Sequence, residues 1–270
     1  MGRTKLSVML CELWNWRDSH GRTKDMSCRD MLTSLDKAGK IVLPAPRCIL
    51  RRPGDSKGVK HFDHDETPVI GKLRDFQPLR VENISSKDDF LQFKSYIDQY
   101  HYLGFERCIS ESMAYMIYSC DNKPLASLQF GSAAWSCRER DSFIGWGKDE
   151  RRHNLSLITN NSRFLIYPWV NIPHLASHIL SLIARRISAD WYQKYGHQLC
   201  VLETFVEVDR FKGTCYKAAN WINVGRTTGR GRNGGHNHAI LPLKDIYVYP
   251  LTKDFQSILC TQETEVGTWR

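Results

Sequence analysis

The segment "GTCYKAANW" (residues 213–221) brings a phenol, an amide and an indole close together. Gly213 and Thr214 are expected to form the turn and the cap of a short helix that carries Tyr216. A phenol can act as a general acid near neutral pH, and we predict that role for Tyr216. Asn220 and Trp221 would then end the helix and form one wall of the site.

Two further residues have side chains suited to chemistry at the ends of regular elements. Glu203 lies near the end of the apolar strand "LCVLETFVEV", where a carboxylate must be paired, exposed or proton-accepting. We predict that it is a general base or orders His101, and the alternative is an exposed strand-end residue. Ser177 lies in the first turn of a helix expected from residue 175, where backbone amides can bind an anion.

Polar and basic residues elsewhere could bind nucleic acid. Asn161 and Arg163 open the strand "SRFLIY" and could read a base edge or bind a phosphate, or could equally form a turn. In "TTGRGRNGGHNH", glycine lets the backbone approach closely and arginine binds phosphate with two hydrogen bonds. We therefore predict that Arg226, Arg230 and Arg232 contact nucleic acid, the alternative being an exposed hairpin tip.

The net charge of +9 is concentrated at the front of the chain, because residues 1–60 hold 13 Lys and Arg but 6 Asp and Glu. Such an excess suggests a polyanionic partner, DNA first of all. Apolar spacing predicts a helix with Leu10, Leu13 and Trp14 on one face, and a second helix capped by Ser27 and ended by Gly39. A short strand is expected over 41–43.

These parts suggest a winged helix-turn-helix over residues 1–50. Arg29, Thr33 and Lys37 fall at helical spacing opposite the apolar side and would face DNA. The alternative is a small helical interaction domain with a solvated face.

Residues 51–80 are rich in proline, glycine and charge and are interpreted as a linker before a main domain over 81–270. Within it, "HFDHDE" contains residue types that can bind a metal. Because they crowd one polar stretch with no second cluster of ligands nearby in the sequence, we favour a solvated loop over a metal site. Nine cysteines without a C-x-x-C pair fit reduced thiols in a cytoplasmic protein, and no apolar run is long enough to span a membrane.

The main domain is expected to follow the order strand, helix, hairpin, strand, helix, strand, short helix and closing strands. The amphipathic helices over 88–100 and 175–195 carry the clearest periodicity, and Asp121-Asn122 marks a hairpin. This order predicts an α/β (α+β) acetyltransferase-like domain, with a mixed sheet that has helices on both faces and a cleft near its middle.

The motifs "YHYLG", "LQFGSAAW", "NNSRFLI", "PWVNIPHLASHIL", "LETFVE" and "GTCYKAANW" resemble those of the DruA-type proteins of Druantia antiphage systems. This resemblance implies antiviral defence or a mobile element, with DNA and proteins of a defence or transposition locus as partners. A more distant similarity links "HYLG", "ASH" and "GTCYKAANW" to Mom-type enzymes, which modify the N6 amino group of adenine in DNA.

The Mom-type similarity implies roles for particular residues. It makes His101 a proton carrier or an iron ligand, Tyr102 a stacking surface or proton donor, and Ser177 part of the site. An aromatic helix end packed on the sheet is the structural alternative for His101 and Tyr102. Because "YPWVNIPHLASH" has two prolines and no glycine where acetyltransferases have their pyrophosphate loop, the sequence argues against acetyl-CoA as the donor.

Three functions remain open from the sequence. The first is a transferase acting on DNA bases, and the second is a non-catalytic DNA-binding accessory protein for defence or transposition. The third is a nuclease, for which Glu203, Glu207 and Asp209 are the candidate metal-binding carboxylates.

Overall fold

The computed structural model describes residues 3–17, 23–44, 59–108, 110–229 and 241–261. The chain divides into two compact units, Met1–Asp55 and Ser56–Arg270.

Unit 1 is built from two helices around a small core. They are α1 (Arg3–Leu13) and α2 (Asp25–Lys37). Cys11, Cys28 and Leu32 are buried between the helices. Gly39 follows α2 with a φ of +68°, which glycine adopts without strain, and it ends the helix as predicted.

The winged helix-turn-helix expected in unit 1 is not confirmed. Residues 41–43 form no strand, and α2 begins at Asp25, so Ser27 is not its cap. Leu13 and Trp14, which were expected on the buried face of the first helix, are 77% and 51% exposed. The core instead uses the small, nonpolar Cys11, which the apolar spacing did not single out.

Unit 2 is organised around a mixed sheet with seven strands among its described residues, in the order β2-β3-β4-β5-β7-β9-β8. The strands are β2 (Arg80–Asn83), β3 (Met113–Tyr118), β4 (Pro124–Ser132), β5 (Ile158–Ile166), β7 (Val201–Glu207), β8 (Ile222–Arg226) and β9 (Lys244–Pro250). Neighbours pair antiparallel except β5 and β7, which are parallel. Val69–Ile70 (β1) and Val170–Asn171 (β6) form a separate parallel pair.

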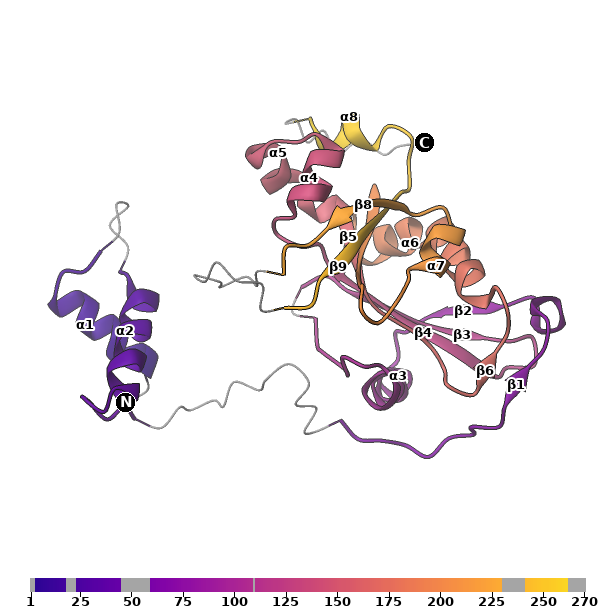
Figure 1. The fold of residues 1–270 in the computed structure, drawn as a ribbon, viewed down its shortest axis with the longest axis horizontal. Coiled ribbons are helices and arrows are strands. Elements are labelled where there is room, and N and C mark those ends of the chain that lie inside the picture. Colours follow the sequence, from indigo (N-terminus) through magenta and orange to yellow (C-terminus); the bar gives the residue numbers. More distant parts are fainter. Residues whose placement is uncertain (1–2, 18–22, 45–58, 109, 230–240, 262–270) are drawn as a thin grey trace. The chain divides into compact units, whose positions relative to one another are not determined.

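Helices cover both faces of this sheet (Figure 1). They are α3 (Lys87–Tyr100), α4 (Arg138–Ile144), α5 (Lys148–Asn154), α6 (Leu175–Tyr195), α7 (Thr214–Ala218) and α8 (Phe255–Leu259), with 3-10 turns η1 (Leu73–Phe76) and η2 (Leu155–Leu157). The helix α3 lies on one face and α6 on the other (Figure 1). The predicted α/β class, a mixed sheet with helices on both faces, is thereby confirmed.

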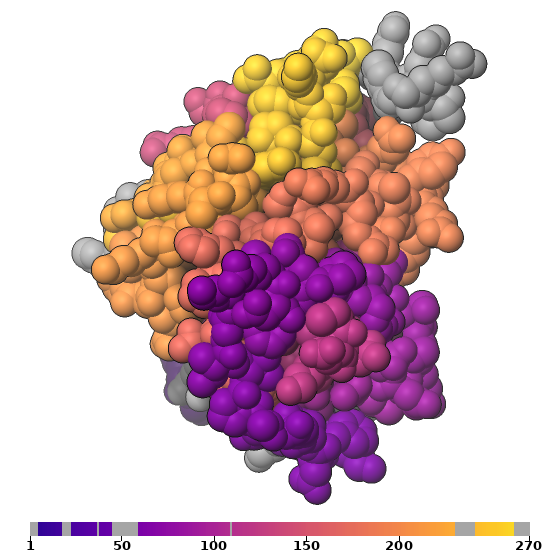
Figure 2. Space-filling view, turned by 90° about the vertical axis from the view of Figure 1, so that its right-hand side faces the viewer, coloured from indigo at the N-terminus to yellow at the C-terminus, as the bar shows by residue number. Residues whose placement is uncertain are grey.

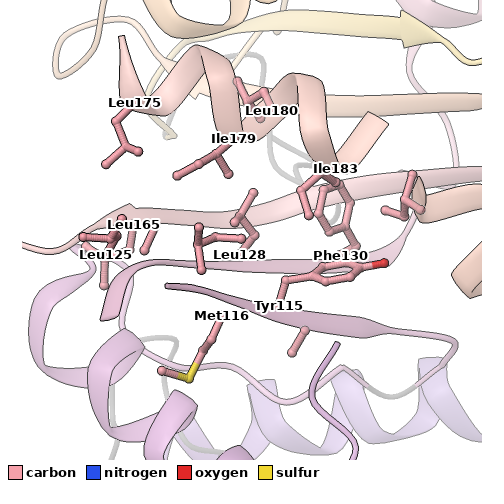
Figure 3. Close-up of a cluster of buried hydrophobic side chains, with 14 of the residues drawn as sticks. Tyr115, Met116, Leu125, Leu128, Phe130, Leu165, Leu175, Ile179, Leu180 and Ile183 are labelled. Atoms are coloured by element: carbon pink, nitrogen blue, oxygen red, sulfur yellow. The ribbon is translucent and has the colours of Figure 1, made fainter. Parts of the chain in front are cut away.

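The periodic residues of α6 form the centre of the core. Leu175, Ile179 and Ile183 pack onto the sheet, where Leu128 and Phe130 of β4 are fully buried (Figure 3). Ser86 caps α3, because its hydroxyl accepts a hydrogen bond from the backbone amide of Asp89 (3.1 Å).

The second half of the segment interpreted as a linker belongs to the folded structure. It contains β1 and η1, and His64 lies among the rings of Tyr96, Tyr100 and Trp169. The ring Nε2 of His64 is 2.9 Å from the hydroxyl of Tyr100. "HFDHDE" therefore anchors the chain against α3. In Figure 2 this part, in purple, lies beside α6 and the orange segment that contains α7 and β8.

The sheet splits between its two parallel strands. The strands β5 and β7 pair at three positions, of which Asn160↔Glu203 is the last, although both strands continue beyond it. On its other edge, β5 has a bulge that leaves Ser162 without a partner in β4. The split lies between the fourth and fifth of the seven strands, in the part of the sheet where a cleft was predicted.

Candidate functional site

Five of the predicted site residues meet at the split and are called the split cluster: His101, Tyr102, Asn161, Arg163 and Tyr216. Asn161 holds the cluster together from β5. Its side-chain amide donates to the carbonyls of Gln129 (3.2 Å) and Arg163 (3.0 Å). Its Oδ1 accepts a hydrogen bond from the Tyr216 hydroxyl (2.9 Å). Asn161 is thus a structural bridge between β5 and α7, and it is 4% exposed.

Arg163 places a buried cation in the cluster. Its side chain is 8% exposed, its Nε donates to the Gly104 carbonyl (2.9 Å), and its Nη1 donates to the Ser162 carbonyl (2.9 Å). The nearest carboxylate is that of Glu106, 3.5 Å from Nη2 and 72% exposed. Burial lowers the pKa of Arg163, because the charge lacks a buried counter-ion. An anion entering the split would supply that counter-charge.

His101 ends α3 as a neutral hydrogen-bond donor. Burial and then the charge of Arg163 lower its pKa to about 4. Its Nδ1 accepts from the backbone amide of Leu103 (3.2 Å), so the proton of the neutral ring is on Nε2. His101 can therefore donate to an oxygen or a ring nitrogen of a ligand at neutral pH.

Tyr102 forms an aromatic platform with two residues that the sequence analysis missed. Its ring lies 5.4 Å from that of Phe211, and the guanidinium of Arg210 is 4.7 Å from its centre. Tyr102 and Phe211 are 37% and 47% exposed. The signal was present in "VDRFKG", where a basic and an aromatic residue stand side by side shortly after the end of β7.

Tyr216 is buried and fully protonated at neutral pH. Burial, followed by the neighbouring Cys215, raises the pKa of its phenol, and Tyr102 adds to this effect. Its ring packs between Trp221 and Tyr247, at 5.1 and 5.8 Å. The hydroxyl is thus held in one position and points at Asn161.

Gln129 lines the same region from β4 and was also missed. Its amide donates to the Glu106 carbonyl (3.1 Å), while its Oε1 is buried without a hydrogen-bond partner among the described residues. It is 4% exposed. An unpaired buried oxygen is unfavourable, so a ligand donor at this point would stabilise it.

Ser177 lies apart from the split cluster. It lines a cavity of about 280 Å³ between α6 and α7, together with His174, His178 and Asn220. Its hydroxyl donates to the His174 carbonyl (3.1 Å). The amide of Leu175 donates to the Ile172 carbonyl (3.2 Å), which leaves this helix end with fewer free amides. The residues here do not fit a glycine-rich pyrophosphate loop.

Glu203 is placed in a buried ion network on α4 rather than in the split cluster. Its Oε1 accepts from the amide of Ala134 (2.6 Å) and its Oε2 from Nη1 of Arg140 (2.7 Å). Arg140 also bonds to Asp141, which binds Arg151. Burial raises the pKa of Glu203, and the charge of Arg140 opposes that shift. Both carboxylate oxygens are occupied by these partners, so Glu203 is not available to order His101.

The other predicted nucleic-acid contacts lie in both units, and several are already paired within their own unit. Arg226 pairs with Asp245 of β9 (2.7 Å), while Arg230 and Arg232 lie outside the described residues. In unit 1, Arg29 pairs with Asp25 (2.8 Å) and the Thr33 hydroxyl donates to the Arg29 carbonyl. Lys37 is the last residue of α2, and its side chain is outside the described part.

The described residues do not offer an iron site at His101. Its Nδ1 lone pair is occupied, and no group of three or more His, Cys, Asp or Glu side chains within the described ranges could hold a metal ion. The same holds for the candidate nuclease carboxylates, because Glu203 binds Arg140 and Glu207 approaches Arg210.

The burial of His101 makes folding sensitive to acid. Its pKa is about 6.5 in an unfolded chain and about 4 when folded, so the unfolded chain binds the proton more tightly between these values. The free energy of unfolding should be unaffected above pH ~6.5 and fall as the pH drops toward ~4. His101→Asn keeps an acceptor for the Leu103 amide. In urea unfolding, this variant should lack the loss of about 3 kcal/mol in the free energy of unfolding that the wild type shows between pH ~6.5 and pH ~4.

The control for this prediction is His153→Asn on α5, an exposed histidine that should leave the pH dependence unchanged. A His101→Asn variant with the wild-type pH dependence would show that another group causes the acid sensitivity.

The fold and the split cluster define an α/β protein with a mixed sheet and a cationic, phenol-rich site where that sheet splits. A family model described as Druantia protein DruA matches residues 51–239. The chain belongs to this DruA family and is therefore a protein of antiphage defence, as the motifs predicted. No curated protein matches it. Within the described residues no helix is long and apolar enough to cross a membrane.

Solved structures with a similar fold include spermidine N-acetyltransferases SpeG of Vibrio cholerae. A SpeG mutant shares 9% identity at a TM-score of 0.38, covering 66% of this chain and 95% of that one. SpeG in complex with CoA and spermine shares 8% at 0.38, covering 63% and 92%. Likeness at this level carries no argument about activity.

Proposed function

We propose that this protein acts in antiphage defence as a transferase that modifies a DNA base in the split between β5 and β7. The amino group at adenine N6 is the favoured target, on the similarity to Mom-type enzymes. The observation that carries the proposal is Arg163, a buried cation without a buried carboxylate partner, near the donor His101 and the phenol of Tyr216. Such a group favours a negatively charged ligand.

The residues around Arg163 suit a nucleotide taken out of its stack. Tyr102 and Phe211 provide aromatic faces for a base, and Arg210 lies over the first of them. Enzymes that act on a base must extrude it, and they hold it by stacking and by hydrogen bonds to its edge. Gln129 and His101 would supply an acceptor and a donor for that edge.

The donor in this proposal is not acetyl-CoA. The stretch before α6 lacks glycine, and the amide of Leu175 is already bonded. Micromolar affinity for acetyl-CoA in a calorimetric titration would overturn this part of the proposal.

The experiment that tests the function compares Arg163→Met with the wild type. DNA from cells that express the wild type should contain a modified nucleoside by mass spectrometry, and Arg163→Met should abolish it together with phage resistance. Methionine keeps the length of the side chain but removes the counter-charge for the ligand. Duplex binding should persist, because most of it comes from phosphate contacts elsewhere.

The matched control is Arg185→Met, which removes an exposed arginine of α6. Full resistance in Arg163→Met would contradict the proposal. If no modified nucleoside forms with any variant, yet resistance follows DNA affinity, the protein is a non-catalytic DNA-binding accessory protein.

A further inference from the structure

Trp135 is a large side chain left open to water outside the split cluster. It lies between β4 and α4, is 64% exposed, and contacts no other ring among the described residues. An isolated exposed apolar residue is common, so exposure by itself indicates nothing. Two further observations distinguish this residue.

The first observation is that the backbone next to Trp135 is held in place by the buried ion pair. The amide of Ala134 donates to Glu203 (2.6 Å), and its carbonyl accepts from Arg140 (2.9 Å). Both charged residues are fully buried. Burying an ion pair is unfavourable unless its hydrogen bonds are satisfied, and here both polar backbone atoms of Ala134 satisfy them. Trp135 is thus an exposed indole that follows a fixed backbone.

The second observation is the charge around the indole. Trp135 lines a hollow of about 200 Å³ with Lys148, Asp149, Arg151, Arg152 and Leu155, which we call the Trp135 groove. Arg151 is paired with Asp141 (2.9 Å), which leaves Lys148 and Arg152 against the carboxylate of Asp149. The groove therefore combines an open aromatic face, an apolar side chain and excess positive charge.

We propose that the Trp135 groove binds single-stranded nucleic acid, with a base stacked on Trp135 and phosphates at Lys148 and Arg152. An aromatic face next to cations is the combination that binds single strands without sequence preference. An acidic peptide would use the cations but would gain little from an open indole face. Glu203, predicted as a general base, becomes here a positioning residue for this platform.

The groove is separate from the proposed chemistry at Arg163. The split cluster binds one nucleotide for reaction, whereas the groove would hold a strand by its bases and backbone. The proposal for the groove is tested by oligonucleotide binding, whereas the proposed function is tested by the yield of modified nucleoside. If the groove does not bind single strands, the proposed base modification is unaffected. If no base is modified, the proposal for the groove is unaffected.

The experiment measures the affinity of the full chain for a fluorescently labelled oligo-dT by anisotropy. Trp135→Ala should weaken binding about fivefold to hundredfold, the range found for loss of one stacked base. Trp135→Phe should retain most of the affinity, because phenylalanine still stacks. Tyr192→Ala, which removes another exposed aromatic side chain (46% exposed), should bind like the wild type.

A second variant tests the phosphate contacts even if Trp135→Ala fails to fold. Lys148→Gln/Arg152→Gln should lower the slope of log affinity against log salt by about 1.4, or about 0.7 per phosphate contact on a single strand. The matched Lys87→Gln/Arg185→Gln, two exposed cations of α3 and α6, should keep the slope.

Three results would overturn the proposal. One is an unchanged affinity in Trp135→Ala. Another is equal weakening by Trp135→Phe and Trp135→Ala, since the indole would then not act by stacking. The third is an unchanged salt slope in Lys148→Gln/Arg152→Gln. If Trp135→Ala keeps its oligonucleotide affinity but loses a co-purifying protein, the groove binds a protein partner instead.

Discussion

Tyr216→Phe is expected to slow the proposed base transfer by about 10²- to 10⁴-fold, the usual contribution of a general acid. The phenol is buried and its pKa is raised by that burial, so it holds its proton at neutral pH. It is fixed between Trp221 and Tyr247, which removes the need to order it during the reaction. The measurement is the yield of modified nucleoside per unit time, with phage plating efficiency as a second readout.

The same substitution has a structural cost that must be separated from the chemical one. Phenylalanine leaves Oδ1 of Asn161 buried without its donor, which should lower the free energy of unfolding by about 1–3 kcal/mol. The variant should nevertheless fold, because the ring contacts remain. Tyr192→Phe, which removes an exposed phenol of α6, should change neither quantity. Wild-type nucleoside yield in Tyr216→Phe would exclude Tyr216 as the acid.

Glu203→Ala is expected to be the most destabilising of the substitutions considered, by about 3–5 kcal/mol in urea unfolding. It would leave Arg140 without its fully buried partner, since both side chains are 0% exposed and 2.7 Å apart. The amide of Ala134 would lose its acceptor as well. An uncompensated charge in the interior is much more unfavourable than the loss of an exposed pair.

Two further variants make this prediction specific. Glu203→Gln keeps an acceptor for Ala134 and should lose less stability than Glu203→Ala. Glu82→Ala breaks an ion pair with Arg80 in which both side chains are 45% exposed, and it should cost no more than about 1 kcal/mol. If Glu203→Ala is as mild as Glu82→Ala, the buried pair of Glu203 and Arg140 does not contribute to stability in the way expected here.

The part of the site that the sequence predicted is the part with a local signature. His101, Tyr102 and Tyr216 follow or begin recognisable helices, and the structure places them at one split. Asn161 was predicted as a nucleic-acid contact, but the structure shows it as a bridge between β5 and α7. That difference depends on Gln129 and Tyr216, which are 32 and 55 residues away in the chain.

The sequence by itself determined the elements whose pattern repeats within a few residues. The apolar period of α6, the β3–β4 hairpin and the end of α2 at Gly39 were all predicted, because side-chain spacing and backbone preferences act locally. Seven-residue helices such as α4 and α5 give little periodic signal, and they were missed.

Only the tertiary structure decided which charges meet. Glu203 pairs with Arg140 across 63 positions, and this removes it from the cleft where sequence reasoning placed it. The split itself arises where β5 and β7 stop pairing after Asn160, next to a bulge at Ser162. Strand pairs and ion pairs between residues so far apart in the chain depend on how the whole sheet assembles. The free energy of a charged group depends on its burial. No short stretch of sequence specifies either the pairing or the burial.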